Sequence, residues 1–354
     1  MGINNSSHFD QIRQQNRRMI RNLMRHLPQL GKAELADISG LSFPTVSALL
    51  SELCLTGEVI ILPDSTSRGG RPAEQFTLNP LFQAAACAYV ENHELFVRVC
   101  DVLGNILFDD RKKLDPGYCD VQLKTNLLDI KTKYPALSVV CLGIPGVIVN
   151  GQVTYLPDYK ELQGLDLQDF LEKELMVPVS IENDVNVLVF AEREKWPDLV
   201  HIFYGTNCPG SGILLDGQII HGFTGCAGEL EYLPFEHNGH SVTFAEELSR
   251  IAAYSMNPEL ARQNDSLTDH TPDPKSELIA CLARAAASFV CVINPPDIAL
   301  SGFDLTEADT EDLGLALADL LPFARCPVFH IVNEVDDLYQ SGLLQIAMDY
   351  WKSK

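Results

Sequence analysis

The stretch "KAELADISGLSFPTVSALLSEL", residues 32–53, has the pattern of two short helices joined by a tight turn. Gly40 supplies the permissive backbone that a sharp turn between helices needs. Ser42 is placed to cap the second helix, and Pro44 falls in its first turn, where a missing N–H group costs nothing. The apolar residues of that helix recur at the spacing of one buried face: Val46, Leu49, Leu50 and Leu53. These features predict a helix-turn-helix whose second helix ends at Gly57.

The remaining positions of the two helices have distinct expected roles. Leu35, Ala36 and Ile38 should form an apolar side on the first helix. Near the N-terminal end of the second helix, the outward residues lie where a recognition helix meets DNA bases and phosphates. The candidate DNA-contacting residues there are Ser42, Phe43, Thr45 and Ser47.

A basic hairpin follows the two helices. "EVIILPD", residues 58–64, and "AEQFTL", residues 73–78, have the composition of strands. The glycine-rich loop between them places Arg68 and Arg71 at its tip. Residues 1–80 are therefore expected to form a winged helix-turn-helix that binds double-stranded DNA. The alternative is an ordinary helical hairpin followed by an unrelated β-ribbon.

The chain is acidic, with a formal net charge of −22, but this charge is unevenly distributed. Residues 1–80 hold 8 Lys and Arg against 7 Asp and Glu, a net charge of +1, so the other 274 residues carry −23. The acidic remainder should repel DNA and confine contact to the N-terminal part. Five arginines precede the helix-turn-helix, as contact with phosphates would require: Arg13, Arg17, Arg18, Arg21 and Arg25. A solvated basic helix is the alternative for each of them.

Composition limits the class of protein further. The chain has 354 residues with 46% hydrophobic content, enough for two or three cores. It has neither an apolar run of about 18 residues nor a signal-peptide pattern, so we expect a cytoplasmic protein. Ten cysteines are scattered without a CxxC pair, which indicates buried, reduced thiols and no cysteine zinc site.

Beyond residue 80, strand and helix patterns alternate and predict two α/β lobes. We expect a first lobe over residues 81–195 and a second over residues 196–354. The polar, proline-containing stretch at residues 261–275 is expected to be a mobile loop.

Four segments of the two lobes carry a family resemblance. They are "LGIPGVIVNGQV", "PVSIENDVNVLVFAERE", "GILLDGQIIHGFTGCAGELEYLP" and "NPPDIALSG", at residues 142–153, 178–194, 212–234 and 294–302. Their order resembles that of ROK proteins, a family of sugar kinases and sugar-responsive repressors. The resemblance implies an α/β fold with an actin-like, two-lobed ROK domain, preceded in the repressor branch by a winged helix-turn-helix.

The ATP-binding pattern of the family is degenerate. ROK kinases open the first lobe with an Asp-x-Gly-Gly-Thr turn that wraps phosphates, whereas this chain has "AYVENHEL" at residues 88–95. The second phosphate loop corresponds to "GTNCPGSG", residues 205–212, where Pro209 removes one amide donor. We therefore expect no ATP, no cofactor and no catalytic residue.

The zinc signature of the family is also missing. The resemblance implies a His and three Cys just after "GELE", where this chain has "FEHNGHSVTFAEELSR", residues 235–250. Two histidines without a thiolate make a poor zinc site. We expect His237 and His240 to be surface residues and predict no metal.

The sugar-binding positions of the family are partly kept. The resemblance places sugar contacts at Gly146, Asn183, Asp184 and Glu229, with Tyr232 in place of a histidine. Glu246 is a further counterpart of a sugar-binding glutamate. The alternative is that these residues survive only as hydrogen bonders at a strand end and a turn.

Three functions remain open for the whole chain. The first is a transcriptional regulator, expected to be a repressor, that binds a two-fold operator as a homodimer or higher homo-oligomer, responds to a sugar or sugar derivative and lacks kinase activity. The second is an active sugar kinase with a fused DNA-binding domain. The third is a regulator controlled by a protein partner, with a vestigial sugar cleft.

Overall fold

The computed structural model describes residues 5–62, 74–205, 209–237, 239–256, 273–322 and 325–354. The chain divides into two compact units. The first comprises Met1–Leu142, Tyr159–Ile181 and Leu343–Lys354, and the second comprises Gly143–Asp158 and Glu182–Gly342. This division differs from the predicted domains 1–80, 81–195 and 196–354, which stay a prediction.

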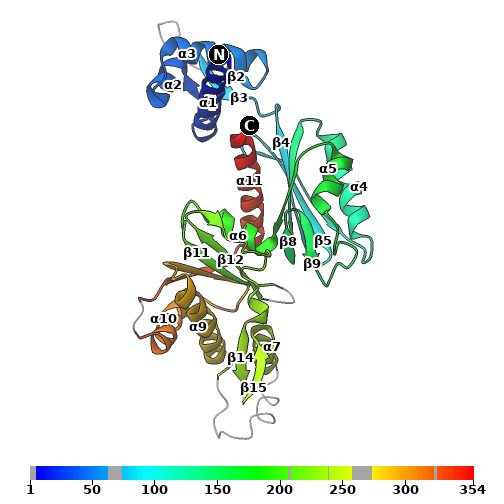
Figure 1. The fold of residues 1–354 in the computed structure, drawn as a ribbon, viewed down its shortest axis with the longest axis vertical. Helices are drawn as coiled ribbons and strands as arrows, with labels where there is room; N and C mark the ends of the chain where they lie inside the picture. The colour runs from blue at the N-terminus through cyan, green and yellow to red at the C-terminus, as the bar shows by residue number, and fades with distance from the viewer. Residues whose placement is uncertain (1–4, 63–73, 206–208, 238, 257–272, 323–324) are drawn as a thin grey trace. The chain divides into compact units, whose positions relative to one another are not determined.

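The N-terminal elements combine three helices with a small sheet (Figure 1). In chain order they are α1 (Asn5–His26), β1 (Leu30–Gly31), α2 (Lys32–Ser39), α3 (Phe43–Leu55), β2 (Val59–Ile61) and β3 (Gln75–Leu78). The strands form an antiparallel sheet in the order β1-β3-β2. Both strands predicted to flank the basic loop are therefore present and paired.

The predicted turn and second helix are confirmed in detail. Gly40 adopts a φ of +69° between α2 and α3, and Gly57 adopts +80° just after α3. Ser42 caps α3 by accepting a hydrogen bond from the Thr45 amide at 3.3 Å. The four apolar residues predicted to form one face are all buried: Val46, Leu49, Leu50 and Leu53.

The predicted apolar side of α2 is wrong in part. Leu35 is fully buried, but Ile38 is exposed. The helix has only eight residues, so a single residue reaches the small core. Its N-terminus is fixed by Glu34, which accepts a hydrogen bond from the Gly31 amide at 2.7 Å.

The first unit contains a five-stranded sheet with helices packed on it. Its elements are β4 (Ala84–Glu91), β5 (Glu94–Asp101), β6 (Ile106–Lys113), α4 (Cys119–Lys133), β7 (Leu137–Ile144), α5 (Leu167–Leu175) and β10 (Val179–Asn183). The strand order is β10-β7-β4-β5-β6, and β4, β5 and β6 are antiparallel neighbours. Figure 1 shows α4 and α5 side by side on this sheet.

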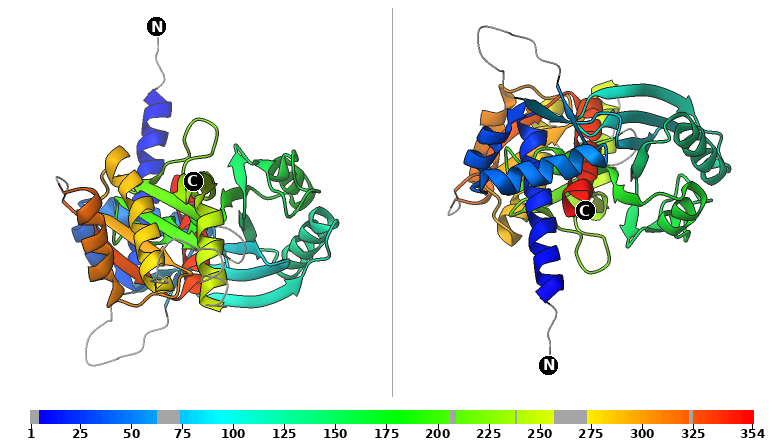
Figure 2. Two further views of the ribbon diagram at one scale, coloured as in Figure 1. Left: turned by 90° about the horizontal axis from the view of Figure 1, so that it is seen from below. Right: turned by 90° about the horizontal axis from the view of Figure 1, so that it is seen from above.

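A second five-stranded sheet forms the centre of the second unit. Its order is β13-β12-β11-β16-β17, with parallel pairing from β11 through β17. The strands are β11 (Leu199–Tyr204), β12 (Pro209–Leu215), β13 (Gln218–Ile219), β16 (Asp297–Ser301) and β17 (Val328–Val332). The helices are α6 (Asp184–Ala191), α7 (Phe244–Met256), α9 (Pro274–Val292), α10 (Asp309–Leu320) and the first part of α11 (Val335–Ser353), whose residues from Leu343 on belong to the first unit. Figure 2 shows α9 and α10 side by side along this sheet, where they share its apolar core.

Two short hairpins and a 3₁₀ turn in the second unit were not predicted. They are β8 (Val147–Val149) with β9 (Gln152–Tyr155), η1 (Leu230–Tyr232), and β14 (Pro234–His237) with β15 (His240–Thr243). The predicted mobile loop at 261–275 lies almost wholly outside the described residues.

The cysteines follow the sequence interpretation only in part. The nine in the described part of the chain are free thiols, of which five are buried and two, Cys226 and Cys291, are exposed. Burial raises the pKa of the Cys119 and Cys141 thiols to about 12, so these groups are inert. No single helix in the described ranges is long and apolar enough to cross a membrane, although the bent pair α2 and α3 passes on length and composition alone.

Candidate functional site

The predicted DNA-contacting residues of α3 gather at its N-terminal end. Phe43 is 53% exposed and Ser42 is also exposed, while Thr45 and Ser47 are half-buried. The hydroxyls of Ser42 and Thr45 lie 2.8 Å apart, so the two side chains support one another. This end of α3 presents an apolar ring beside hydroxyl groups, a combination able to contact thymine methyls and phosphates. Arg68 and Arg71 lie outside the described residues.

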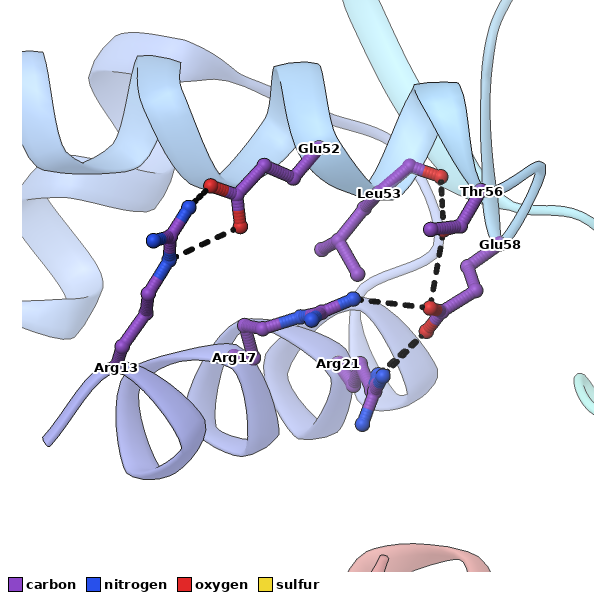
Figure 3. Close-up of polar contacts among 7 residues, drawn as sticks. All are labelled: Arg13, Arg17, Arg21, Glu52, Leu53, Thr56 and Glu58. Carbon is purple, nitrogen blue, oxygen red and sulfur yellow. Dashed lines mark hydrogen bonds and ion pairs between the residues drawn. The ribbon is translucent and has the colours of Figure 1, made fainter. Parts of the chain in front are cut away.

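Three of the five arginines of α1 form ion pairs within the protein (Figure 3). Arg13 forms an ion pair with Glu52 of α3. Arg17 Nη2 and Arg21 Nε lie 3.2 Å and 2.7 Å from the two carboxylate oxygens of Glu58. Arg17 and Arg21 are mostly shielded and paired within the protein, so the solvated-helix alternative does not describe them, whereas the Arg13 side chain stays 59% exposed.

The spacing of these residues carries a signal that the sequence interpretation missed. Arg13, Arg17 and Arg21 follow one another at four-residue steps and so share one face of α1. The acidic partners Glu52 and Glu58 come from the end of α3 and the residue before β2. The basic stripe is visible in the sequence, but its acidic partners lie 37 to 41 residues further along the chain, and only the fold pairs them with it.

Arg25 is also engaged inside the first unit. Its guanidinium lies 5.9 Å from the ring centre of Trp351, and Nη1 donates to Asn22 at 3.0 Å. Burial, with a smaller contribution from the charge of Arg21, lowers the pKa of Arg25 to about 10.

Gly146 and Asn183, two of the predicted ligand-binding residues, are joined by a hydrogen bond. Asn183 Nδ2 donates to the Gly146 carbonyl at 2.9 Å, and Asn183 Oδ1 accepts from the Asn186 amide at 3.0 Å as the cap of α6. Gly146 has a φ of +91°, and a Cβ there would lie 2.3 Å from the Tyr155 carbonyl oxygen. Asn183 thus has a structural role, and only its second Nδ2 hydrogen and remaining lone pairs can face a ligand.

Two carboxylates, Asp184 and Glu229, stand close enough for their charges to interact. Asp184 is the first residue of α6, and burial raises its pKa to about 6 although the Val185 amide donates to it at 2.9 Å. Burial first, then the charges of Glu231 and Asp184, raise the pKa of Glu229 to about 7. Partly buried carboxylates of this kind are suited to accept hydrogen bonds from hydroxyl groups.

Tyr232 lies at the edge of the same group of elements. It is 53% exposed on η1, and its hydroxyl donates to the Tyr155 hydroxyl on β9 at 3.0 Å. Hydrogen bonds with Glu231 and Tyr155 raise the pKa of Tyr232. The pair supplies two aromatic faces of the type that stack on a sugar ring.

Sequence reasoning missed two residues at this site, Glu182 and His221. Glu182 Oε1 accepts from the Asn183 amide and from Asn186 Nδ2, both at 2.9 Å. Its other oxygen lies 2.8 Å from His221 Nε2, and this hydrogen bond raises the pKa of His221. The only signal was the position of Glu182 directly before Asn183.

Close backbone approaches hold the loop that carries His221 and Glu229. A Cβ on Gly225 would lie 2.7 Å from the Ile148 carbonyl oxygen, and one on Gly228 would lie 2.0 Å from that of Ser211. Glycine at these two positions therefore keeps the loop against β8 and β12.

The segment expected to replace the zinc site is the β14–β15 hairpin. Glu246, the suggested sugar-binding counterpart, accepts from the Thr243 amide at 2.7 Å and so serves as a helix cap for α7. His240 is exposed as expected, but His237 is half-buried, 3.6 Å from Glu247, which corrects its assignment as a surface residue. In the ranges that the structure describes, no group of three or more His, Cys, Asp or Glu could hold a metal ion.

A tight hairpin occupies the position at which the resemblance places the phosphate-wrapping turn of ROK kinases. Asn92 and His93 join β4 to β5 with φ values of +51° and +56°, as in a two-residue type I′ turn. The His93 amide donates to the Tyr159 hydroxyl at 2.9 Å, and the His93 carbonyl accepts from Leu114 at 2.7 Å. The turn is therefore bound to its own unit on both backbone groups.

Comparison with known proteins defines the class. Residues 121–243 match the model of the ROK family, so the chain contains a ROK family domain, as its motifs predict. A crystal structure of a ROK family transcriptional regulator, a homologue of the E. coli MLC protein, superposes with a TM-score of 0.67 at 17% identity. The superposition covers 96% of this chain and 99% of that one, and it shows a mixed α/β fold of the ROK type.

Two curated relatives match part of this chain. The xylose repressor of Bacillus spizizenii is 22% identical over 234 residues, which cover 62% of this chain. The glucokinase of Thermotoga maritima is 26% identical over 205 residues, which cover 46% of this chain. The chain spans 60% and 63% of the length of these two proteins.

Proposed function

We propose that this protein is a DNA-binding transcriptional repressor that responds to a sugar or sugar derivative and lacks kinase activity. The observation that carries the proposal is the exposed N-terminal end of α3, behind a tight helix-helix turn and ahead of a ROK family domain. The name of the Bacillus spizizenii relative supports repression and suggests a pentose as the first effector to try.

In this proposal the N-terminal elements are a winged helix-turn-helix. α3 enters the major groove with Phe43, Thr45 and Ser47 toward the bases, and Ser42 holds the helix end in shape. Arg68 and Arg71 of the loop after β2 contact phosphates or the minor groove. A homodimer presents two such helices to a two-fold operator, and the protein works in the cytoplasm.

The effector site comprises Gly146, Asn183, Asp184, Glu229 and Tyr232. Asp184 and Glu229 accept hydroxyl protons, and the exposed ring of Tyr232 covers an apolar face of the sugar. A neutral ligand suits this site because nearby carboxylates repel an anionic one. Ligand binding lowers the affinity for DNA if the ligand prefers a conformation in which the two recognition helices no longer match the operator.

An active sugar kinase is the second candidate, favoured by the glucokinase relative and by Asp184 as an available base. Against it stands the β4–β5 turn, whose His93 amide is already bonded to Tyr159. A base cannot transfer a phosphoryl group that nothing positions.

The test is capture of DNA by the purified full-length protein from fragments of its own genome, followed by sequencing. The proposal expects a few fragments that share a two-fold sequence, and it expects the Phe43→Ala, Ser47→Ala double variant to lose them. Recovery of random fragments by both proteins would overturn the proposal.

A further inference from the structure

A buried chain of three polar side chains crosses the second unit. His201 on β11 places Nδ1 3.0 Å from Glu192 Oε2 and Nε2 2.7 Å from Ser301 Oγ. The exposed fractions of His201, Ser301 and Glu192 are 0%, 2% and 9%. A neutral imidazole satisfies both contacts when Nδ1–H donates to the carboxylate and Nε2 accepts from the serine hydroxyl.

The order Ser-His-Glu resembles that of a hydrolase triad, but burial decides against such a role. A substrate carbonyl must reach the serine oxygen, and Ser301 is covered by the core of the sheet. These hydrogen bonds must therefore have a role in the structure of the protein and not in catalysis. The three residues come from the end of α6, from β11 and from β16, so the hydrogen bonds tie that helix to the central strands.

The helix held by these hydrogen bonds, α6, also carries Asp184. Glu192 is the C-cap of α6, while Asn183 and Asp184 form its N-terminal end. α6 has only eight residues, about 12 Å at the usual rise per residue, so a shift at one end is transmitted to the other.

The flanks of α6 leave it little freedom. A Cβ on Gly212 of β12 would lie 2.7 Å from the Val185 carbonyl oxygen, and one on Gly342 of α11 would lie 2.2 Å from that of Val187. Close contacts of this kind restrict tilt, and the capped ends restrict movement along the helix axis. The Glu192 contact adds a polar restraint at the C-terminal end of α6, where Asn183 and Asn186 supply polar contacts at its N-terminal end.

We propose that His201 is a positioning residue for the ligand site, because it holds α6 through Glu192 and so sets the place of Asp184. The inference rests on the proposed function only in naming that site as the one for a sugar. Since all three side chains are buried, their effect on a ligand is transmitted through α6.

Hydrogen exchange in the full-length protein tests the positioning without any ligand. His201→Phe removes both contacts, and we expect at least tenfold faster exchange of the amides in residues 184–192. His201→Gln keeps a donor for Glu192 and an acceptor for Ser301, so it should restore most of the protection. If His201→Phe does not fold, Ser301→Ala takes its place. We expect a smaller increase in the exchange rate of the same amides in that variant.

The matched control is His330→Phe. His330 Nε2 lies 2.7 Å from Asp297 Oδ1, so it also pairs with a carboxylate in the same sheet, but that partner lies on β16 and not at the end of α6. The His330 ring also lies 4.2 Å from that of Trp196, so we expect the effect of His330→Phe to stay in β16, β17 and the segment around Trp196. Equal acceleration in residues 184–192 by both Phe variants, or none in His201→Phe and Ser301→Ala, would overturn the proposal.

A second measurement reads the ligand site directly. The titration midpoint of the Asp184 carboxyl, followed by NMR of its side-chain carbon, should shift toward that of an ordinary aspartate in His201→Phe and remain in place in His330→Phe. D-xylose binding by calorimetry should weaken at least tenfold in His201→Phe alone. If the parent protein binds no D-xylose while the exchange and titration results hold, the positioning stands and the choice of xylose as effector fails.

Discussion

Arg21 Nε lies 2.7 Å from Glu58 Oε2, and the same carboxylate is paired with Arg17, so α1 is braced against the segment between α3 and β2. The pair is mostly shielded from water, with side-chain exposures of 20% and 12%. Removing one partner of such a pair leaves the other charge partly buried and unpaired.

We predict that Glu58→Ala lowers the free energy of unfolding of the N-terminal elements by about 1–3 kcal/mol. The measurement is hydrogen exchange of the α3 amides across a urea series. Glu74→Ala is the control, because Glu74 is exposed in its pair with Lys32 and should contribute about 0–1 kcal/mol. Equal effects of the two changes would contradict the brace.

The salt dependence of DNA binding should distinguish the arginines of α1, which pair within the protein, from Arg68 and Arg71 of the loop after β2. Arg68→Ala, Arg71→Ala together should reduce the slope of log K against log salt by about 1.8, because two phosphate contacts are lost. Arg17→Ala should leave the slope unchanged, since that side chain is already paired with Glu58. An unchanged slope in the wing variant would count against the wing assignment.

Substitutions at the end of α3 should separate helix capping from DNA recognition. Ser42→Ala should cost about 1 kcal/mol of stability through loss of the cap. Phe43→Ala should leave stability within about 0.5 kcal/mol, since the ring is exposed, and weaken operator binding by about 1–3 kcal/mol. Thermal unfolding and fluorescence anisotropy measure the two effects, and Ser51→Ala, on a more distant turn of α3, is the control.

Stability should depend on pH through Asp184 and Glu229. Their pKa values rise to about 6 and about 7 in the folded chain, so between about pH 4 and pH 7 the folded state binds more protons than the unfolded state. The free energy of unfolding therefore falls as the pH rises through that window, by about 1–3 kcal/mol for each group.

Glu229→Gln should flatten this dependence and stabilise the protein above pH 7. Urea titrations at pH 5 and pH 8 measure the change, and Glu236→Gln, at an exposed position on β14, should leave the dependence unaltered. A parent protein whose stability rises between these pH values, or a Glu229→Gln variant with the parent's slope, would refute the assignment.

The β4–β5 turn predicts that no sugar kinase activity will be found. A coupled assay over a panel of sugars should give no more ADP from the parent than from Asp184→Asn. Sugar-dependent ADP release by the parent alone would revive the kinase candidate.

Local patterns determined most of what could be predicted. The buried face of α3, its cap at Ser42 and the two strands that flank the basic loop follow from periodicity and residue type, and the structure agrees with them. The roles of Arg17 and Arg21 could not be found in this way, because their partner Glu58 is about 40 residues away and only the fold brings them together. Likewise, the contact of Asn183 with Gly146 and that of Glu182 with His221 depend on loops whose paths are set by distant glycines.

We expect a sugar bound at Asp184 to weaken binding of α3 to its operator. The most direct measurement is fluorescence anisotropy of a labelled operator fragment, selected from the protein's own genome, with the parent and Asp184→Ala during titration with a panel of neutral sugars that includes D-xylose. We predict that at least one sugar releases the parent from the DNA and that Asp184→Ala binds the operator but does not respond. Release of both proteins at the same sugar concentration, or of neither by any sugar, would contradict the claim.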